Sequence, residues 1–130
     1  MDKRTDYRPL TPFNSILLRN INNMLTIKTF QVGPISENCY VMSDDTKEAV
    51  IIDCGCFTES EWKSIRRYCD DNGLKIVRML NTHFHFDHMM GILFAYPAIK
   101  LPFDGNYADE YLYKSLGTQI ESFLGIDMAC

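Results

Sequence analysis

The three histidines of this 130-residue chain lie together in one short segment. His83, His85 and His88 fall within the run His83-Phe84-His85-Phe86-Asp87-His88, which also holds the carboxylate of Asp87. Imidazole and carboxylate groups are ordinary ligands of divalent transition metals. In an extended segment, side chains two residues apart point the same way, so His83 and His85 can present two imidazoles to one ion. Asp87 and His88 can then reach a second ion, or a different edge of the same ion.

The predicted secondary structure places this segment shortly after a strand. Residues 74–80 have the apolar character of a strand, and a helix is predicted to begin near His88 and to end at Pro97. Proteins of the α/β class assemble their ligand sites beyond the carboxyl ends of strands. The histidines therefore lie where the local structure favours a binding site.

The remaining elements predict a single α/β domain. A chain of 130 residues buries roughly two-thirds of its surface on folding, which suffices for one core. Strands are predicted at residues 24–30, 38–42 and 49–52, a helix with a capping box at residues 58–73, a short strand at 99–101, a turn at 102–105 and a helix at 108–123. Strands and helices in this order are typical of an α/β layered fold.

Residues 1–23 differ in composition from the rest of the chain. They carry four basic residues, two prolines and an asparagine-rich end. We expect a flexible N-terminal extension over residues 1–23 and the folded domain over residues 24–130. Neither part holds a secretory signal or an apolar run that approaches the ~20 residues of a membrane span.

Charge and cysteine content limit the partners and the compartment. Thirteen basic and seventeen acidic residues give a net charge of −4 without a long block of either sign, so a nucleic-acid partner has little electrostatic support. The five cysteines are an odd number and too sparse for a disulfide scaffold, so we expect a reducing cytoplasm. Cys54 and Cys56 lack a second cysteine pair at zinc-finger spacing, and one of them is expected to pack as a small buried residue.

Two stretches of the chain resemble the motifs of a known family. Thr82-His83-Phe84-His85-Phe86-Asp87-His88-Met89-Met90-Gly91 resembles the T-H-x-H-x-D-H-x-x-G signature of the metallo-β-lactamase superfamily. Ile51-Ile52-Asp53-Cys54-Gly55 resembles its upstream apolar-Asp-x-Gly element. The resemblance runs from about Met24 to the end of the chain and is strongest toward the glyoxalase II-type thioester hydrolases. It implies a four-layered αβ/βα sandwich of two similar halves, of which this chain corresponds to the first αβ half.

The same resemblance implies a role for each residue of the motifs. His83 and His85 would bind a first zinc ion, and Asp87 and His88 a second. Asp87 would also orient the attacking hydroxide, while Asp53 would brace the metal loop without being a ligand. Two divalent ions lower the pKa of a bridging water and polarise the carbonyl that it attacks. Mixed histidine and carboxylate ligation also accepts iron or manganese.

The chain departs from the family pattern after His88. In the family, a third histidine for the first metal, a bridging aspartate and a further histidine for the second come from the C-terminal half. This sequence holds no histidine after His88. Two protein ligands for each ion leave the coordination open, because catalytic zinc normally keeps three.

These observations support two main functional interpretations, beside a third in which the chain is a small structural-zinc binding module. The first is a zinc-dependent hydrolase that acts on a thioester or related acyl bond of a small-molecule substrate, truncated before the remaining metal ligands. The second is a non-catalytic fragment or remnant that only binds metal or self-associates, as a homo-oligomer, through a sheet face left apolar. Neither interpretation includes a nucleic-acid or membrane partner.

Overall fold

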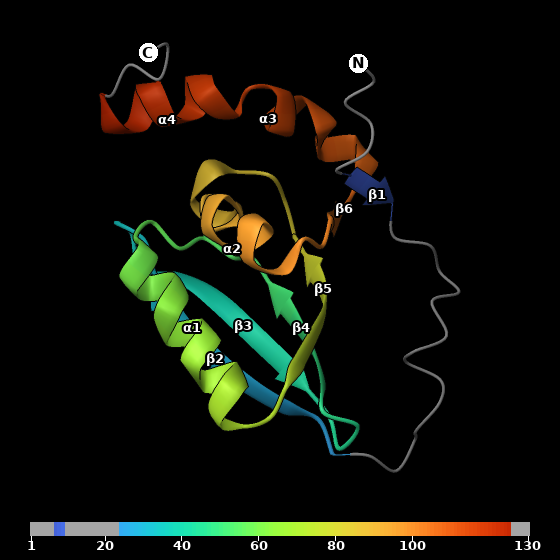
Figure 1. Ribbon diagram of the computed structural model, residues 1–130. Coiled ribbons are helices and arrows are strands. Elements are labelled where there is room, and N and C mark those ends of the chain that lie inside the picture. The colour runs from blue at the N-terminus through green and yellow to red at the C-terminus, as the bar shows by residue number, and fades with distance from the viewer. Residues whose placement is uncertain (1–6, 10–23, 126–130) are drawn as a thin grey trace.

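A computed structural model of the chain describes residues 7–9 and 24–125. They form a six-stranded mixed sheet with helices packed against one face (Figure 1). The elements in chain order are β1 (Tyr7–Pro9), β2 (Thr26–Val32), β3 (Glu37–Ser43), β4 (Glu48–Ile52), α1 (Glu59–Asp71), β5 (Lys75–Leu80), the 3-10 turn η3 (Phe86–His88), α2 (Ile92–Ile99), β6 (Phe103–Gly105), the 3-10 turn η4 (Tyr107–Asp109), α3 (Glu110–Lys114) and α4 (Leu116–Leu124). The predicted α/β fold class is confirmed.

The sheet has the strand order β1-β6-β5-β4-β3-β2. β2, β3 and β4 are antiparallel neighbours, whereas β4, β5, β6 and β1 pair in parallel. Because Ile52 lies opposite Leu80, β4 and β5 end at the same edge of the sheet. The antiparallel strand β3 begins at that edge, with Tyr40 opposite Ile52. The loops that follow β4 and β5 and the first residues of β3 therefore meet.

The helix α1 begins as its sequence predicts. The Thr58 hydroxyl accepts a hydrogen bond from the amide of Glu61, and the Glu61 carboxylate accepts one from the amide of Thr58, which completes the capping box. Glu61 also accepts a hydrogen bond from the amide of Gly33 at 3.0 Å. One side chain thus fixes the start of the helix and its contact with the turn between β2 and β3.

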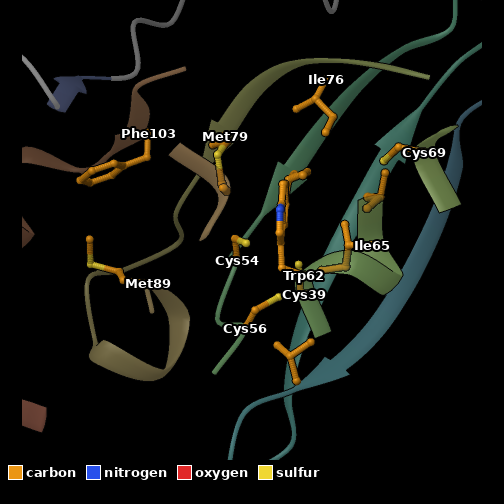
Figure 2. Close-up of a cluster of buried hydrophobic side chains, with 14 of the residues drawn as sticks. Cys39, Cys54, Cys56, Trp62, Ile65, Cys69, Ile76, Met79, Met89 and Phe103 are labelled. Atoms are coloured by element: carbon orange, nitrogen blue, oxygen red, sulfur yellow. The ribbon is translucent and has the colours of Figure 1, made fainter. Parts of the chain in front are cut away.

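The hydrophobic core lies between the sheet and α1 and α2. Trp62, Ile65 and Cys69 form the buried face of α1. Figure 2 shows Cys39, Cys54 and Cys56 near Trp62 in the core. The four cysteines among the described residues are buried free thiols, with Cys54 and Cys56 both packed as small core residues.

The opposite face of the sheet is apolar and half-exposed. Tyr40, Met42 and Ile52 alternate with the core residues of β3 and β4 and are only partly buried. On the edge strand β2, Ile27 is 61% exposed and lies opposite Met42. No helix of the described residues covers this face (Figure 1).

Three predictions for the C-terminal quarter are wrong. Residues 99–101 were expected to form a short strand, but Ile99 is the last residue of α2 and Lys100 ends that helix in a left-handed conformation. Residues 102–105 were expected to form a turn, but Phe103–Gly105 is the strand β6, which pairs with β5 and β1. The strand is held by backbone pairing with β5 and β1, and Gly105 leaves room for the ring of Phe84; no local pattern contains these long-range contacts. The helix expected at residues 108–123 is broken at Ser115, whose hydroxyl donates a hydrogen bond to the carbonyl of Leu112.

Pro97 does not end the helix that contains it. The helix α2 begins at Ile92, after the 3-10 turn η3, and continues past Pro97 to Ile99. A proline removes one helical hydrogen bond, but the amide of Lys100 still donates to the carbonyl of Tyr96 at 2.8 Å. The helix ends at Lys100, which adopts the left-handed conformation.

The N-terminal region contributes one edge strand. Residues 7–9 pair in parallel with β6, and the rest of the predicted extension over residues 1–23 lies outside the described residues, as does Cys130. Among the helices that the structure describes, none is long and apolar enough to cross a membrane.

Candidate metal centre

The histidine segment lies at the sheet edge where β4 and β5 end. Asp53 follows β4 directly, and its amide donates a hydrogen bond to the carbonyl of Leu80, the last residue of β5. The segment that holds the histidines begins three residues further on, at His83. Glu37, the first residue of β3, also lies at this edge. The tertiary fold thus brings three separate stretches of sequence to one place.

Asp53 is the buried anchor of this region. It adopts a left-handed backbone conformation with φ of 55°, which aspartate tolerates better than most residues. Its side chain accepts two hydrogen bonds from Thr82, both at 2.7 Å, one from the backbone amide and one from the hydroxyl. Asp53 therefore ties the loop after β4 to the loop after β5, as the family resemblance implies for a bracing residue.

The Thr82 hydroxyl fixes the proton position on His83. The hydroxyl has one proton, which it donates to Asp53, and its oxygen lies 2.9 Å from Nδ1 of His83. The oxygen must then accept a hydrogen bond from Nδ1, so a neutral His83 carries its lone pair on Nε2. That nitrogen is the one left free to bind a metal.

His88 lies between three carboxylates. Its Nδ1 is 3.1 Å from Oδ2 of Asp53, a close contact that is not aligned as a hydrogen bond. Its Nε2 is 3.1 Å from Oε2 of Glu37 and 3.4 Å from Oδ2 of Asp87. A histidine held by a carboxylate at one ring nitrogen presents the other in a fixed direction, which is the usual outer-shell arrangement of metal-binding histidines.

The same contacts shift two pKa values in opposite directions. Burial opposes the charge of Asp53, yet contacts from His88 and Thr82 outweigh it and lower the pKa of Asp53. Burial also opposes the charge of His88, but Asp53, Asp87 and Glu37 together raise the pKa of His88 above its usual range. The surroundings of His88 therefore favour a positive charge.

The donor set fits a divalent metal ion. Glu37, Asp87 and His88 each offer one ligand atom, and these atoms lie within 4.8 Å of one another. The ring of His83 lies 4.0 Å from that of His88 and 4.7 Å from that of His85, measured between centroids. The structure thus brings all four predicted ligands into one cluster. That they bind metal stays a prediction.

Glu37 was not expected at the site, although the sequence holds a signal for it. An antiparallel strand that begins where two parallel strands end presents its first side chain to the loops of those strands.

Cys54 and Cys56 do not join a metal-binding group among the described residues. Contact with Cys39 raises the pKa of Cys54, and contact with Cys54 raises that of Cys56, so both remain protonated thiols in the core.

Glycine and phenylalanine residues hold the histidine segment against the fold. A Cβ atom at Gly55 would overlap the carbonyl oxygen of Asp87, and one at Gly91 would lie 2.5 Å from the carbonyl oxygen of Cys54. Phe84 and Phe86, which alternate with the histidines, are buried. The loops after β4 and β5 therefore pack backbone against backbone, and Gly91 allows the chain to approach the carbonyl oxygen of Cys54 closely.

The helix α4 contributes a side chain that binds the segment between the histidines. The side-chain oxygen of Gln119 accepts a hydrogen bond from the amide of Phe86 at 3.1 Å, and its nitrogen donates to the carbonyl of Phe84 at 3.4 Å. These two contacts hold the backbone on either side of His85. The side-chain nitrogen of Gln119 also donates a hydrogen bond to the carbonyl of Leu112, in α3, at 2.7 Å.

The comparisons with known proteins identify the family. A sequence model of the metallo-beta-lactamase superfamily matches residues 32–118, which is more than half of the chain and includes both predicted motifs. The chain belongs to the metallo-beta-lactamase superfamily.

The curated relatives are longer than this chain. An uncharacterized protein of Aquifex aeolicus (strain VF5) is 33% identical over 89 residues, which are 68% of this chain and 39% of the relative. An uncharacterized protein of Mycobacterium leprae (strain TN) is 38% identical over 66 residues, 50% of this chain and 29% of the relative. The chain thus spans well under half the length of these relatives.

Solved structures confirm the fold. TTHA1623 in a di-iron-bound form superposes with a TM-score of 0.63 and 27% identity, over 77% of this chain and 48% of that chain. The B3 metallo-beta-lactamase BLEG-1 gives 0.53 and 31%, over 60% of this chain and 35% of that chain. In both, the chain corresponds to part of a metallo-beta-lactamase fold, in agreement with the predicted first αβ half.

Proposed function

We propose that this chain supplies the first set of metal ligands of a metal-dependent hydrolase that cleaves a thioester or related acyl bond. The observation that carries the proposal is the cluster of His83, His85, Asp87 and His88 around a buried, braced Asp53. Zinc is the proposed metal, with up to two ions in a complete site and with iron or manganese as alternatives. The di-iron form of TTHA1623 supports metal binding in a similar fold.

Each side chain has a task in this proposal. The chemistry supplied by a bound divalent ion is the lowering of the pKa of water toward neutrality and the polarisation of the acyl carbonyl. His83 offers Nε2 because Thr82 occupies its Nδ1. Asp87 would accept a hydrogen bond from the attacking water and so orient it. Asp53 holds His88 and Thr82 in position.

An apolar cavity lies beside the helix α2. It has a volume of about 330 Å³, and Met89, Ile92 and Phe103 are among the residues that line it. None of its lining residues is a candidate metal donor. The proposal of a small-molecule substrate therefore rests on the donor set and not on this cavity.

Metal content tests the proposal. The purified protein, loaded with zinc, iron or manganese and then desalted, is expected to retain metal when analysed by inductively coupled plasma mass spectrometry. His83→Ala is expected to retain less, because one imidazole of the first pair is lost. Gln31→Ala, an exposed polar residue on β2, should match the unaltered protein. Equal and negligible metal in all three proteins would refute the proposed function.

The second candidate function is a non-catalytic piece that self-associates through the open sheet face. The observation in its favour is the half-exposed apolar face of β2, β3 and β4, with Ile27 61% exposed. Large apolar surfaces drive association. We expect sedimentation velocity to show dimers or larger species that Ile27→Lys weakens. Leu93→Lys, 60% exposed on α2, is the matched control, and a monomeric unaltered protein would rule this candidate out.

A further inference from the structure

We propose that Glu37 is a metal ligand and that it completes, with Asp87 and His88, a single-ion site held entirely by this chain. This inference rests on the proposed function, because it assumes that the histidine segment binds metal. It differs from the motif-based assignment, in which Asp87 and His88 alone serve the second ion. With Glu37 that ion has three protein ligands, the number that catalytic metal sites normally keep.

The geometry places the three donors around one point. Oε2 of Glu37 lies 3.1 Å from Nε2 of His88, and Oδ2 of Asp87 lies 3.4 Å from the same nitrogen. All three ligand atoms fall within 4.8 Å of one another. Their side chains are 23%, 13% and 13% exposed, so the donors are partly withdrawn from water but still reachable by an ion.

The orientation of the His88 ring is set by the contact of its Nδ1 with Asp53. Asp53 lies 3.1 Å from Nδ1, and Asp53 is itself held by two hydrogen bonds from Thr82. The ring therefore turns Nε2 toward the two other carboxylates. A buried carboxylate thus lies behind one ring nitrogen, and the two other carboxylates lie before the other, which is the side from which a metal ion would be bound.

Glu37 is held in place by a rigid element. It is the first residue of β3, where it lies opposite Val32 of β2. Its Oε1 accepts a hydrogen bond from the amide of Asn38 at 3.2 Å, which leaves Oε2 directed at His88. Glu37 and Asp87 each hold a carboxylate oxygen near Nε2 of His88. A divalent ion that displaces the proton of His88 would be bound by these two oxygens together with Nε2.

The donor types predict the class of metal. Two carboxylates and one imidazole form a harder ligand set than the two imidazoles of His83 and His85. Carboxylate ligands suit manganese, whereas imidazole ligands suit zinc and iron. We infer that the Glu37 site accepts Mn²⁺ and that the His83 and His85 pair is not needed to fill it.

Manganese binding in the full chain tests the inference. The double variant His83→Ala/His85→Ala removes the other imidazoles, and Mn²⁺ is titrated while the electron paramagnetic resonance signal of the free ion is followed. We expect one tightly bound ion. Adding Glu37→Gln keeps the side-chain shape but removes the charge. Because the loss of an outer-shell partner alone weakens metal binding by about 10- to 100-fold, the loss of a ligand should weaken Mn²⁺ binding at least as much. Adding Glu48→Gln, an exposed glutamate at the far end of β4, should leave the affinity unchanged.

The possible results separate this inference from the proposed function. If the double variant binds no Mn²⁺ while the unaltered protein does, the three donors do not hold an ion without His83 and His85, and the single-ion site is refuted. If Glu37→Gln leaves the affinity unchanged, Glu37 is not a ligand. In both cases the metal site of the proposed function stands. If the unaltered protein binds no ion of any kind, the proposed function itself fails. Circular dichroism of each metal-free variant shows that affinities are compared between folded proteins.

Discussion

Gly55→Ala is expected to destabilise the protein by about 3 kcal/mol, the upper end of the usual cost of overpacking a buried position. Gly55 is buried, and the added methyl group would overlap the backbone carbonyl oxygen of Asp87. Because the obstacle is backbone, a change of rotamer cannot relieve it, and the two loops must move apart. The midpoint of thermal unfolding should fall by roughly 10 °C.

A matched glycine makes this expectation specific. Gly117, near the start of α4, has nothing within 4 Å of its added Cβ atom. Gly117→Ala should therefore be neutral or stabilise the helix by up to about 1 kcal/mol. Equal midpoints for Gly55→Ala and the unaltered protein would show that the loops after β4 and β5 do not pack as closely as described.

Asp53→Asn is expected to destabilise the metal-free protein by about 3 kcal/mol, the lower end of the cost of removing one partner from a buried charge pair. The asparagine keeps one acceptor for Thr82 but loses the second and the charge beside His88. Urea unfolding in the presence of a chelator measures the difference. Asp45→Asn, an exposed residue in the turn before β4, should stay within about 0.5 kcal/mol.

The Asp53 effect should depend on pH in a defined direction. The pKa of Asp53 is lower in the folded protein than its ordinary value of 3.8. A lowered pKa stabilises the folded state above the ordinary value, and this stabilisation is lost as the pH falls through the lowered pKa. The stability difference between the unaltered protein and Asp53→Asn should therefore shrink in acid. A difference that grows as the pH falls below 3.8 would contradict the ion pair.

Both predictions concern the same contact between two loops. Gly55 allows the loop after β4 to approach Asp87, and Asp53 binds that loop to Thr82. The metal donors follow in the chain within a few residues of these contacts. The stability of the loops and the geometry of the donors are therefore linked, and either substitution should also weaken metal binding.

Much of the fold could be predicted from local patterns. The capping box at Thr58 and Glu61 correctly predicted the start of α1, because its hydrogen bonds join residues three apart. The alternation of apolar and polar residues over 24–30 predicted β2, and the apolar run over 49–52 predicted β4. Prediction failed at residues 102–105, where strand formation depends on pairing with β5 and on the ring of Phe84. Those partners are more than fifteen residues away, so no local pattern contains them.

The sequence alone determined the chemistry of the candidate site. The spacing of His83, His85, Asp87 and His88 specifies imidazole and carboxylate donors within one short segment, and their similarity to a family signature agrees with the superfamily match. Only the tertiary structure decided which further groups surround them. Glu37 and Gln119 reach the segment from β3 and α4 because strand pairing and helix packing close long loops of chain. Side-chain type is a local property of the sequence, whereas the distance between Glu37 and His88 depends on the whole sheet.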